Sequence, residues 1–328
     1  EMIVTITFNP SLDYFVFLDR PFHEGMIMRA KRTGLRAGGK GVNISLVLAE
    51  QGIQSRAVMF LGGRVGQLIE QEISGKAEIE VVKVEISQEN RTNIKIMDQV
   101  ETAINALGPQ VTQEDQNALL MALQSIRQDD LVVISGSFCP GVGAELVGRI
   151  SDLVSSAGAK LITDIPNLTE DHYRRIRPHL IKPNLEELGL IFNTHVDLAN
   201  YRGYVQRLLQ DGVANVVLSL GKEGSYFANA KEAYQIWGPP VEVVNTVGCG
   251  DAMLANMIAS LVRQHDLIET LKYAEAAGRA KAASAGLPQQ ETIERLARQV
   301  VVQPVCKGES MSRRMKVIEE RKGELIWP

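Results

Sequence analysis

The stretch NTVGCGDAM, at residues 245–253, joins an expected strand at 241–244 to a long helical pattern at 252–262. Two glycines one residue apart, Gly248 and Gly250, let the backbone approach a ligand and turn its N–H groups toward one point. The start of a helix adds unpaired N–H groups and the positive end of the helix dipole. The segment is therefore predicted to form an anion hole suited to a phosphoryl group.

Asp251, at the edge of this segment, has two interpretations. As a general base, its carboxylate would accept a proton from an attacking hydroxyl. As a structural residue, it would cap the N-terminus of the following helix. A single GxGD segment does not separate the two.

A second glycine segment, RAGGKGVN at residues 36–43, also stands at the start of a helical pattern. Its glycines allow a ligand to approach closely, Lys40 offers a cation, and Asn43 offers a donor and an acceptor. The spacing is not that of a Walker A loop, and a glycine turn with a solvated lysine is the alternative.

Three further polar segments follow expected strands. In an open α/β sheet, ligands bind at the carboxyl ends of the strands, so these segments are expected to share one site. Their structural alternatives are a helix cap for Asn184, a β-turn for the segment at 219–224, and a turn residue for Asp13. The segments are NPSLD at 9–13, IKPNLEEL at 181–188 and SLGKEG at 219–224.

Apolar runs alternate with amphipathic stretches from about residue 37 onward, which is typical of an α/β fold with a mostly parallel sheet. The continuous runs VVI at 132–134 and VVL at 216–218 suit strands covered on both faces. Expected strands lie at 57–61, 131–135, 160–165, 179–181 and 215–220, and expected helices at 42–50, 114–126, 144–157 and 198–209.

Two segments, 11–36 and 89–105, interrupt this alternation with β-like runs that have no helix between them. A small two-segment sheet is a poor independent domain, so we expect it to lean on the core or on a second copy of itself. The tail at 303–328 carries charges of both signs and is expected to hold one amphipathic helix or to be partly disordered. The predicted core comprises residues 1–10, 37–88 and 106–302.

Charge and cysteine content narrow the function classes. The chain has 35 Lys and Arg against 39 Asp and Glu, and this net charge of −4 does not favour nucleic acid as a partner. The three cysteines, Cys139, Cys249 and Cys306, form no CxxC pair or zinc spacing and suit a reducing compartment. Neither a signal peptide nor an apolar run of membrane-spanning length is found. We therefore expect a cytoplasmic protein with no membrane or nucleic-acid partner.

The two glycine segments, with Asp251 after the second, resemble the signatures of the ribokinase-like (PfkB) carbohydrate kinases, and the resemblance covers roughly residues 2–302. It implies a ribokinase-like three-layer α/β/α core with a mostly parallel sheet. It also implies a small β-sheet lid over the sugar, which often clasps its twin to form a homodimer. ATP as co-substrate and Mg²⁺ as cofactor follow from the same resemblance.

The resemblance also assigns roles to residues. Asp251 would deprotonate the sugar hydroxyl, and the N–H groups of Gly248, Cys249 and Gly250 would stabilise the γ-phosphoryl group. Glu187 would support Mg²⁺, through water. The residues assigned to the nucleotide site are Lys182, Asn184, Ser219, Gly221 and Gly224.

Within this family the chain is similar to the phosphosugar kinases, namely 1-phosphofructokinases, tagatose-6-phosphate kinases and minor 6-phosphofructokinases. A substrate phosphate requires Arg and Lys around it, and Lys40 and Arg91 each stand in a matched motif. The matched motifs are NPSLD at 9–13, GKG at 39–41, RTNIK at 91–95, SGS at 135–137 and NTVG at 245–248. The expected substrate site comprises Asp13, Arg29, Gly38, Gly39, Lys40, Asn43, Arg91, Asn93 and Ser137.

Two departures from the family pattern affect which sugar is expected as the substrate, but not the expected reaction class. Cys249 stands where alanine is usual, and Asp164 is followed by Ile-Pro-Asn where hydroxyl residues and glycine are usual. We expect phosphorylation of fructose 1-phosphate to fructose 1,6-bisphosphate. Tagatose 6-phosphate and fructose 6-phosphate are the alternative substrates, and a non-catalytic sugar-phosphate sensor is the alternative class.

Overall fold

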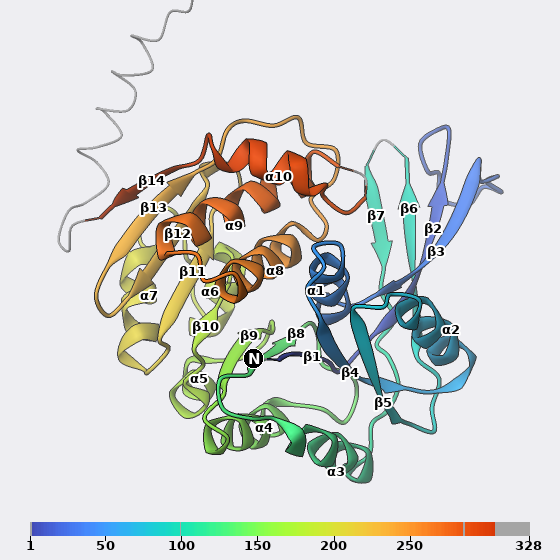
Figure 1. Cartoon of the computed structure of the whole chain (residues 1–328). Coiled ribbons are helices and arrows are strands. Elements are labelled where there is room, and N and C mark those ends of the chain that lie inside the picture. The colour runs from blue at the N-terminus through green and yellow to red at the C-terminus, as the bar shows by residue number, and fades with distance from the viewer. Residues whose placement is uncertain (1, 99, 285, 306–328) are drawn as a thin grey trace, which may run out of the picture.

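The computed structural model describes residues 2–98, 100–284 and 286–305, and these form a large and a small sheet (Figure 1). The strands of the large sheet are β1 Ile3–Thr7, β4 Ser55–Leu61, β5 Ile79–Glu85, β8 Leu131–Ser135, β9 Lys160–Asp164, β10 Leu180–Ile181, β11 Asn215–Ser219, β12 Ser225–Asn229, β13 Ala233–Trp237 and β14 Val301–Pro304. Their spatial order is β14-β13-β12-β11-β10-β9-β8-β1-β4-β5. Neighbours from β11 to β5 are parallel, whereas β12, β13 and β14 join as antiparallel strands.

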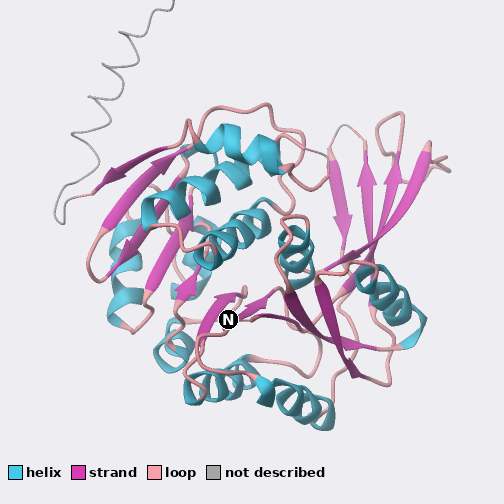
Figure 2. Cartoon of the chain, viewed as in Figure 1, coloured by secondary structure: helices cyan, strands magenta, loops and turns pink. Residues whose placement is uncertain are grey.

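Helices cover both faces of the large sheet, with the strands between them (Figure 2). One face carries α3 Gln113–Ala122, α4 Ala144–Ser156, α5 Glu170–Ile176, α6 Leu185–Phe192 and α7 Tyr201–Gln210. The other carries α1 Lys40–Ala49, α8 Cys249–Val262, α9 Leu267–Ala282 and α10 Gln290–Ala297, while α2 Gly63–Ser74 packs beside β5. Within β8, Val132 and Ile134 face the first layer, and Leu131 and Val133 face the second. The predicted α/β class, with a mostly parallel sheet buried on both faces, is confirmed.

The small sheet stands apart from the large one, beyond α1 (Figure 1). Its strands are β2 Ser11–Phe17, β3 Arg32–Gly38, β6 Arg91–Met97 and β7 Glu101–Ile104, in the order β3-β2-β6-β7. They come from the two segments that interrupt the helix–strand alternation, and β3 extends two residues past the expected boundary at 36. The parallel pairing of β2 with β6 joins the two segments into one layer.

Three sequence expectations need correction. Residues 241–244 form a loop and not a strand, because β13 ends before Gly238, Pro239 and Pro240, and proline cannot donate to a sheet ladder. Helix α8 begins at Cys249 rather than Ala252. Gln303 and Pro304, which were expected to open the tail, belong to β14 and pair with β13. Residues 306–328 of the expected tail, with Cys306, lie outside the described residues.

Among the residues that the structure describes, no helix combines the length and the apolar character needed to cross a bilayer.

Candidate active site

A single cavity of about 1410 Å³ runs from the small sheet to the carboxyl end of the large one. Strand ends and helix N-termini converge there, as the parallel topology requires. Its lining includes seventeen of the predicted site residues: Asp13, Gly39, Lys40, Asn43, Arg91, Asn93, Ser137, Lys182, Asn184, Glu187, Ser219, Gly221, Gly224, Gly248, Cys249, Gly250 and Asp251.

The segment at 248–250 forms the N-terminal turn of α8. Gly248 is the residue before the helix and has φ +79°, a conformation that favours glycine. A Cβ on Gly250 would lie 2.8 Å from Nζ of Lys182, so only glycine fits there without displacing that ammonium. The first N–H groups of a helix have no acceptor within the helix, so they are available as donors at its N-terminus. Of these, the Cys249 N–H makes one long contact, 3.4 Å to the Thr246 carbonyl.

Asp251 lies in the first turn of α8 and is not its N-cap, since Gly248 holds that position. Its carboxylate is buried, and Oδ2 accepts a hydrogen bond of 2.7 Å from Nδ2 of Asn43 on α1. Burial and then the negative charge of Asp164 raise the pKa of Asp251, against the hydrogen bond from Asn43 and two nearby lysines. A carboxylate with a raised pKa, held at a cavity wall, is suited to accept a proton.

A lysine–aspartate network of Lys40, Asp164 and Lys182 faces Asp251. Oδ2 of Asp164 lies 3.3 Å from Nζ of Lys40, and Oδ1 lies 3.7 Å from Nζ of Lys182. Burial acts to raise the pKa of Asp164, but Lys182 and Lys40 outweigh it and hold the pKa below its ordinary value. Burial likewise acts to lower the pKa of Lys40, yet Asp164, Glu187 and Asp251 raise it overall. Lys40 therefore carries its charge at the cavity wall. The Nζ of Lys182 lines the same cavity, beside the same carboxylate.

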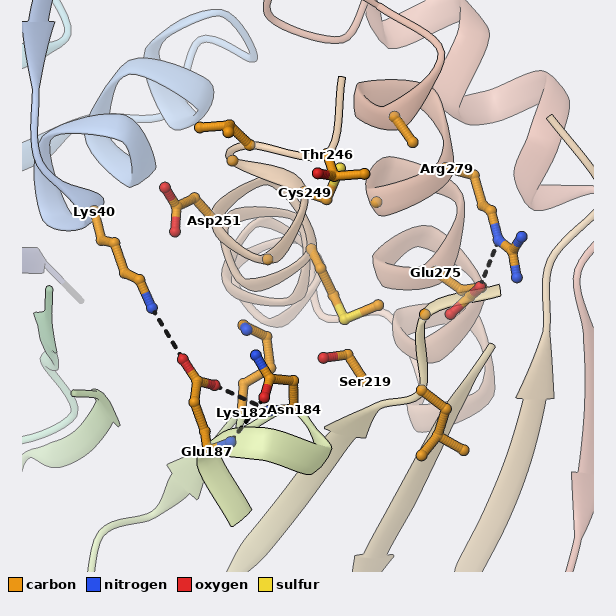
Figure 3. Close-up of a pocket in the computed structure, with 18 of the residues that line it drawn as sticks. Lys40, Lys182, Asn184, Glu187, Ser219, Thr246, Cys249, Asp251, Glu275 and Arg279 are labelled. Atoms are coloured by element: carbon orange, nitrogen blue, oxygen red, sulfur yellow. Dashed lines mark hydrogen bonds and ion pairs between the residues drawn. The ribbon is translucent and has the colours of Figure 1, made fainter. Parts of the chain in front are cut away.

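Asn184 and Glu187 form a capping box at the start of α6. Oδ1 of Asn184 accepts from the Glu187 N–H at 2.8 Å, and Oε2 of Glu187 accepts from the Asn184 N–H at 2.9 Å. The structural interpretation of Asn184 is thus confirmed. Oε1 of Glu187 still faces the cavity, 3.6 Å from Nζ of Lys40 (Figure 3).

On the side of the small sheet, polar residues of β2 and β6 meet in register. Oδ1 of Asp13 accepts hydrogen bonds from Nδ2 of Asn93 at 2.9 Å and from the Ser11 hydroxyl at 2.7 Å. Arg91 donates to the carbonyls of Asn9 and Ala106, at 2.9 and 3.1 Å, and lies 3.5 Å from the Ser137 hydroxyl.

Two residues of the expected substrate site do not line the cavity. Arg29 is exposed in the segment between β2 and β3. Gly38 lies behind Asp13, where a Cβ would come within 2.6 Å of Oδ2 of that aspartate. Gly38 thus makes room for the Asp13 carboxylate and is not itself part of the cavity wall.

Glu275 and Arg279 were not expected at the site; both project from α9 and line the cavity on the side away from Lys40 (Figure 3). Oε1 of Glu275 accepts from Nε of Arg279 at 2.9 Å, and Oε2 accepts from the Ser225 hydroxyl at 2.8 Å. No local motif marks them, because they sit in the middle of a helix. The role of Asp164 within a charged network was also missed, although its place at the end of β9 was a usable signal.

Comparison with known proteins accounts for this arrangement. The pfkB family carbohydrate kinases match residues 7–292. The chain belongs to this family. It is 30% identical over 302 residues to 1-phosphofructokinase of Bacillus subtilis, covering 92% of this chain and 99% of the relative. It is 32% identical over 283 residues to tagatose-6-phosphate kinase of Staphylococcus epidermidis, covering 84% and 91%.

A solved structure agrees with this assignment. Phosphofructokinase-2 from Escherichia coli, in complex with fructose-6-phosphate, has a TM-score of 0.83 at 25% identity, covering 90% of this chain and 98% of that one. These similarities confirm the predicted family, the ribokinase-like fold and the enzyme class of a sugar-phosphate kinase. Membership of a carbohydrate kinase family implies a sugar substrate and ATP as co-substrate.

Proposed function

We propose that this pfkB-family kinase transfers the γ-phosphoryl group of ATP to fructose 1-phosphate and yields fructose 1,6-bisphosphate. The observation that carries the proposal is the cavity lined by Asp251, by the segment at 248–250 and by the two lysines that contact Asp164. A base, a set of N–H donors and two cations at one point are what phosphoryl transfer requires.

In the proposed mechanism, the C6 hydroxyl oxygen attacks the γ-phosphorus while the bond to the β–γ bridging oxygen breaks. The hydroxyl proton passes to the Asp251 carboxylate. The N–H groups at the start of α8 and the ammonium of Lys182 would stabilise the charge on the transferring group. Asp13 and Asn93, already hydrogen-bonded to each other, would orient the sugar hydroxyls.

Mg²⁺ is proposed to enter with ATP as part of the substrate. Within the described ranges, no three His, Cys, Asp or Glu side chains cluster closely enough to hold a metal ion. Glu187 commits one carboxylate oxygen to the helix cap and turns the other toward Lys40. It therefore suits a contact through a water ligand of Mg²⁺ rather than direct coordination.

Arg91 supports a substrate that already carries a phosphate. Its two terminal nitrogens donate to backbone carbonyls, but its buried Nε has no hydrogen-bond partner. Burial closes Nε to a ligand, but Nη2 lies 3.5 Å from the Ser137 hydroxyl at the cavity wall, where the guanidinium would donate to a phosphate oxygen. Fructose 1-phosphate is preferred over tagatose 6-phosphate because the 1-phosphofructokinase similarity covers more of both chains. It is preferred over fructose 6-phosphate because the identity is 30% with 1-phosphofructokinase and 25% with phosphofructokinase-2.

The experiment that names the substrate is ADP release measured with MgATP and each of the three phosphosugars. We expect kcat/KM to be highest with fructose 1-phosphate. A higher kcat/KM with either of the other two sugars would make that sugar the proposed substrate, with the same site residues.

The pH dependence should show Asp251 as the base. Burial and Asp164 raise the pKa of Asp251. Because the base acts in its ionised form, kcat/KM should be highest above that pKa and should fall as the pH falls through it. Asn43→Ala removes the hydrogen bond that lowers the pKa, so the acidic limb should move to higher pH. Asn117→Ala, at an exposed position of α3, is the control and should leave the acidic limb at the same pH. An acidic limb unmoved by Asn43→Ala would contradict the assignment.

The small sheet is proposed to pair with its counterpart in a homodimer. Tyr14, Leu35, Ile94 and Ile104 form one row across its four strands, on the face opposite Asp13 and Asn93. Leu35, Ile94 and Ile104 are 51%, 38% and 57% exposed, so an apolar row lies open to solvent. A second copy of this sheet would cover that row.

Ile94→Glu should convert the dimer to a monomer in sedimentation velocity, because it places a charge in the centre of the apolar row. Leu190→Glu, at an exposed apolar position on α6, is the control and should leave the dimer intact. A monomeric wild type, or a dimer that survives Ile94→Glu, would contradict the proposed interface.

A further inference from the structure

The loop that carries Gly248 is attached to the C-terminal end of α9. The N–H groups of Val244 and Asn245 both donate to the carbonyl of Ala282, at 2.7 and 3.1 Å. Within the loop, Oδ1 of Asn245 accepts from the Val247 N–H at 2.7 Å. The position of the anion hole is therefore set in part by the last turn of α9.

Lys281 lies in that last turn and packs against the loop. Its side chain is buried, and its Cε would lie 3.5 Å from a Cβ placed on Gly248. Its ammonium has one long hydrogen bond, 3.4 Å to the Ser284 carbonyl. Among the described residues, no carboxylate lies within ion-pair distance of it. A lysine that only complements the helix dipole would extend into water, because burying an ammonium with so little compensation is costly.

The charges around Lys281 are those of the reaction centre and of the small sheet. Burial lowers the pKa of Lys281, whereas the Cys249 thiol, Glu101 of β7 and Asp251 act to raise it. Arg36 of β3 acts in the same direction as burial. The ammonium thus sits behind the anion hole, within electrostatic reach of the base and of the small sheet.

We propose that Lys281 is a positioning residue for phosphoryl transfer. Its buried side chain packs against the loop at 244–248, and its ammonium adds positive charge behind the N–H groups that receive the transferring phosphoryl. It does not line the cavity and so does not touch the substrates. This inference rests on the proposed kinase function.

The test compares Lys281→Met, Lys281→Arg and the matched control Lys272→Met on the same helix. Lys281→Met should lower kcat roughly 10-fold, less than the loss of a direct oxyanion donor, with KM for the sugar phosphate unchanged. Lys281→Arg keeps the charge and should recover most of that loss, and Lys272→Met should match the wild type. A kcat for Lys281→Met equal to that of Lys272→Met would overturn the proposal.

A second variant guards against a simple loss of folding. Lys281→Ala leaves a space for a small cation, and added methylammonium should restore part of its kcat in a saturable manner, with no effect on Lys281→Met. An absence of rescue in Lys281→Ala, at a thermal unfolding midpoint equal to that of the wild type, would also overturn the proposal. An inactive wild type would instead count against the proposed kinase function itself.

Discussion

Asp251→Asn should lower kcat by at least ~100-fold while the sugar phosphate still binds, because general-base catalysis contributes on this scale. The carboxylate is buried at the start of α8 and receives a hydrogen bond from Asn43. Asparagine keeps the shape and can accept the same hydrogen bond through its amide oxygen, but it cannot take a proton from the sugar hydroxyl. Steady-state kinetics and calorimetric binding of the sugar phosphate give the two readouts.

Stability provides the control for this variant. The pKa of Asp251 is raised in the folded protein. Ionisation of this carboxylate therefore lowers the free energy of unfolding, and the loss is complete above the folded pKa. Asp251→Asn removes this loss and should leave the melting temperature equal or higher at neutral pH. Unchanged turnover in a folded variant would contradict the base assignment. A wild-type protein that binds the sugar phosphate but shows no turnover would favour a non-catalytic sensor.

Lys182→Met should lower kcat by about 100-fold to 1,000-fold, the range found when a donor to the developing charge is removed. Lys182 is buried, and its ammonium lies close to Gly250 in the anion hole. Its contact to Asp164, at 3.7 Å, is long, so its protons remain available for phosphate oxygens. Lys40 still pairs with Asp164 in the variant, which limits the loss of stability.

Two further variants make the Lys182 prediction specific. Lys182→Arg retains the charge and should keep more activity than Lys182→Met. Lys160→Met, at the exposed first position of β9, removes the same charge at the other end of the strand from Asp164 and should have the activity of the wild type. A kcat for folded Lys182→Met within about threefold of the wild type would show that Lys182 does not act on the phosphoryl group.

The parts of the fold that depend on local apolar pattern could be predicted from the sequence. The run at 131–135 matches β8 residue for residue, because a strand buried on both faces is continuously apolar. The segment at 241–244 was assigned wrongly, because its valines imitate a strand although Pro239 and Pro240 isolate it from the sheet. Helix α8 starts three residues before the expected position, because its first turn contains Gly250 and lies outside the apolar pattern.

The parts of the site that depend on tertiary contacts were harder to predict from the sequence. Asp251 and Asn43 stand in separate glycine motifs, so both could be chosen, but their hydrogen bond spans 208 residues of sequence. Glu275 and Arg279 carry no motif and reach the cavity only because α9 packs against α8 and the sheet. Arg29 is expected at the site for its positive charge within the segment at 11–36, and charge alone does not determine whether a loop residue turns inward.

The central claim is that this carbohydrate kinase acts on a ketohexose that already carries one phosphate. The most direct test is ADP release with MgATP and either fructose 1-phosphate or free fructose, at matched concentrations. We expect turnover with fructose 1-phosphate and none with free fructose, since Lys40 and Arg91 line the cavity and are proposed to bind a substrate phosphate. Turnover with free fructose alone would contradict the central claim.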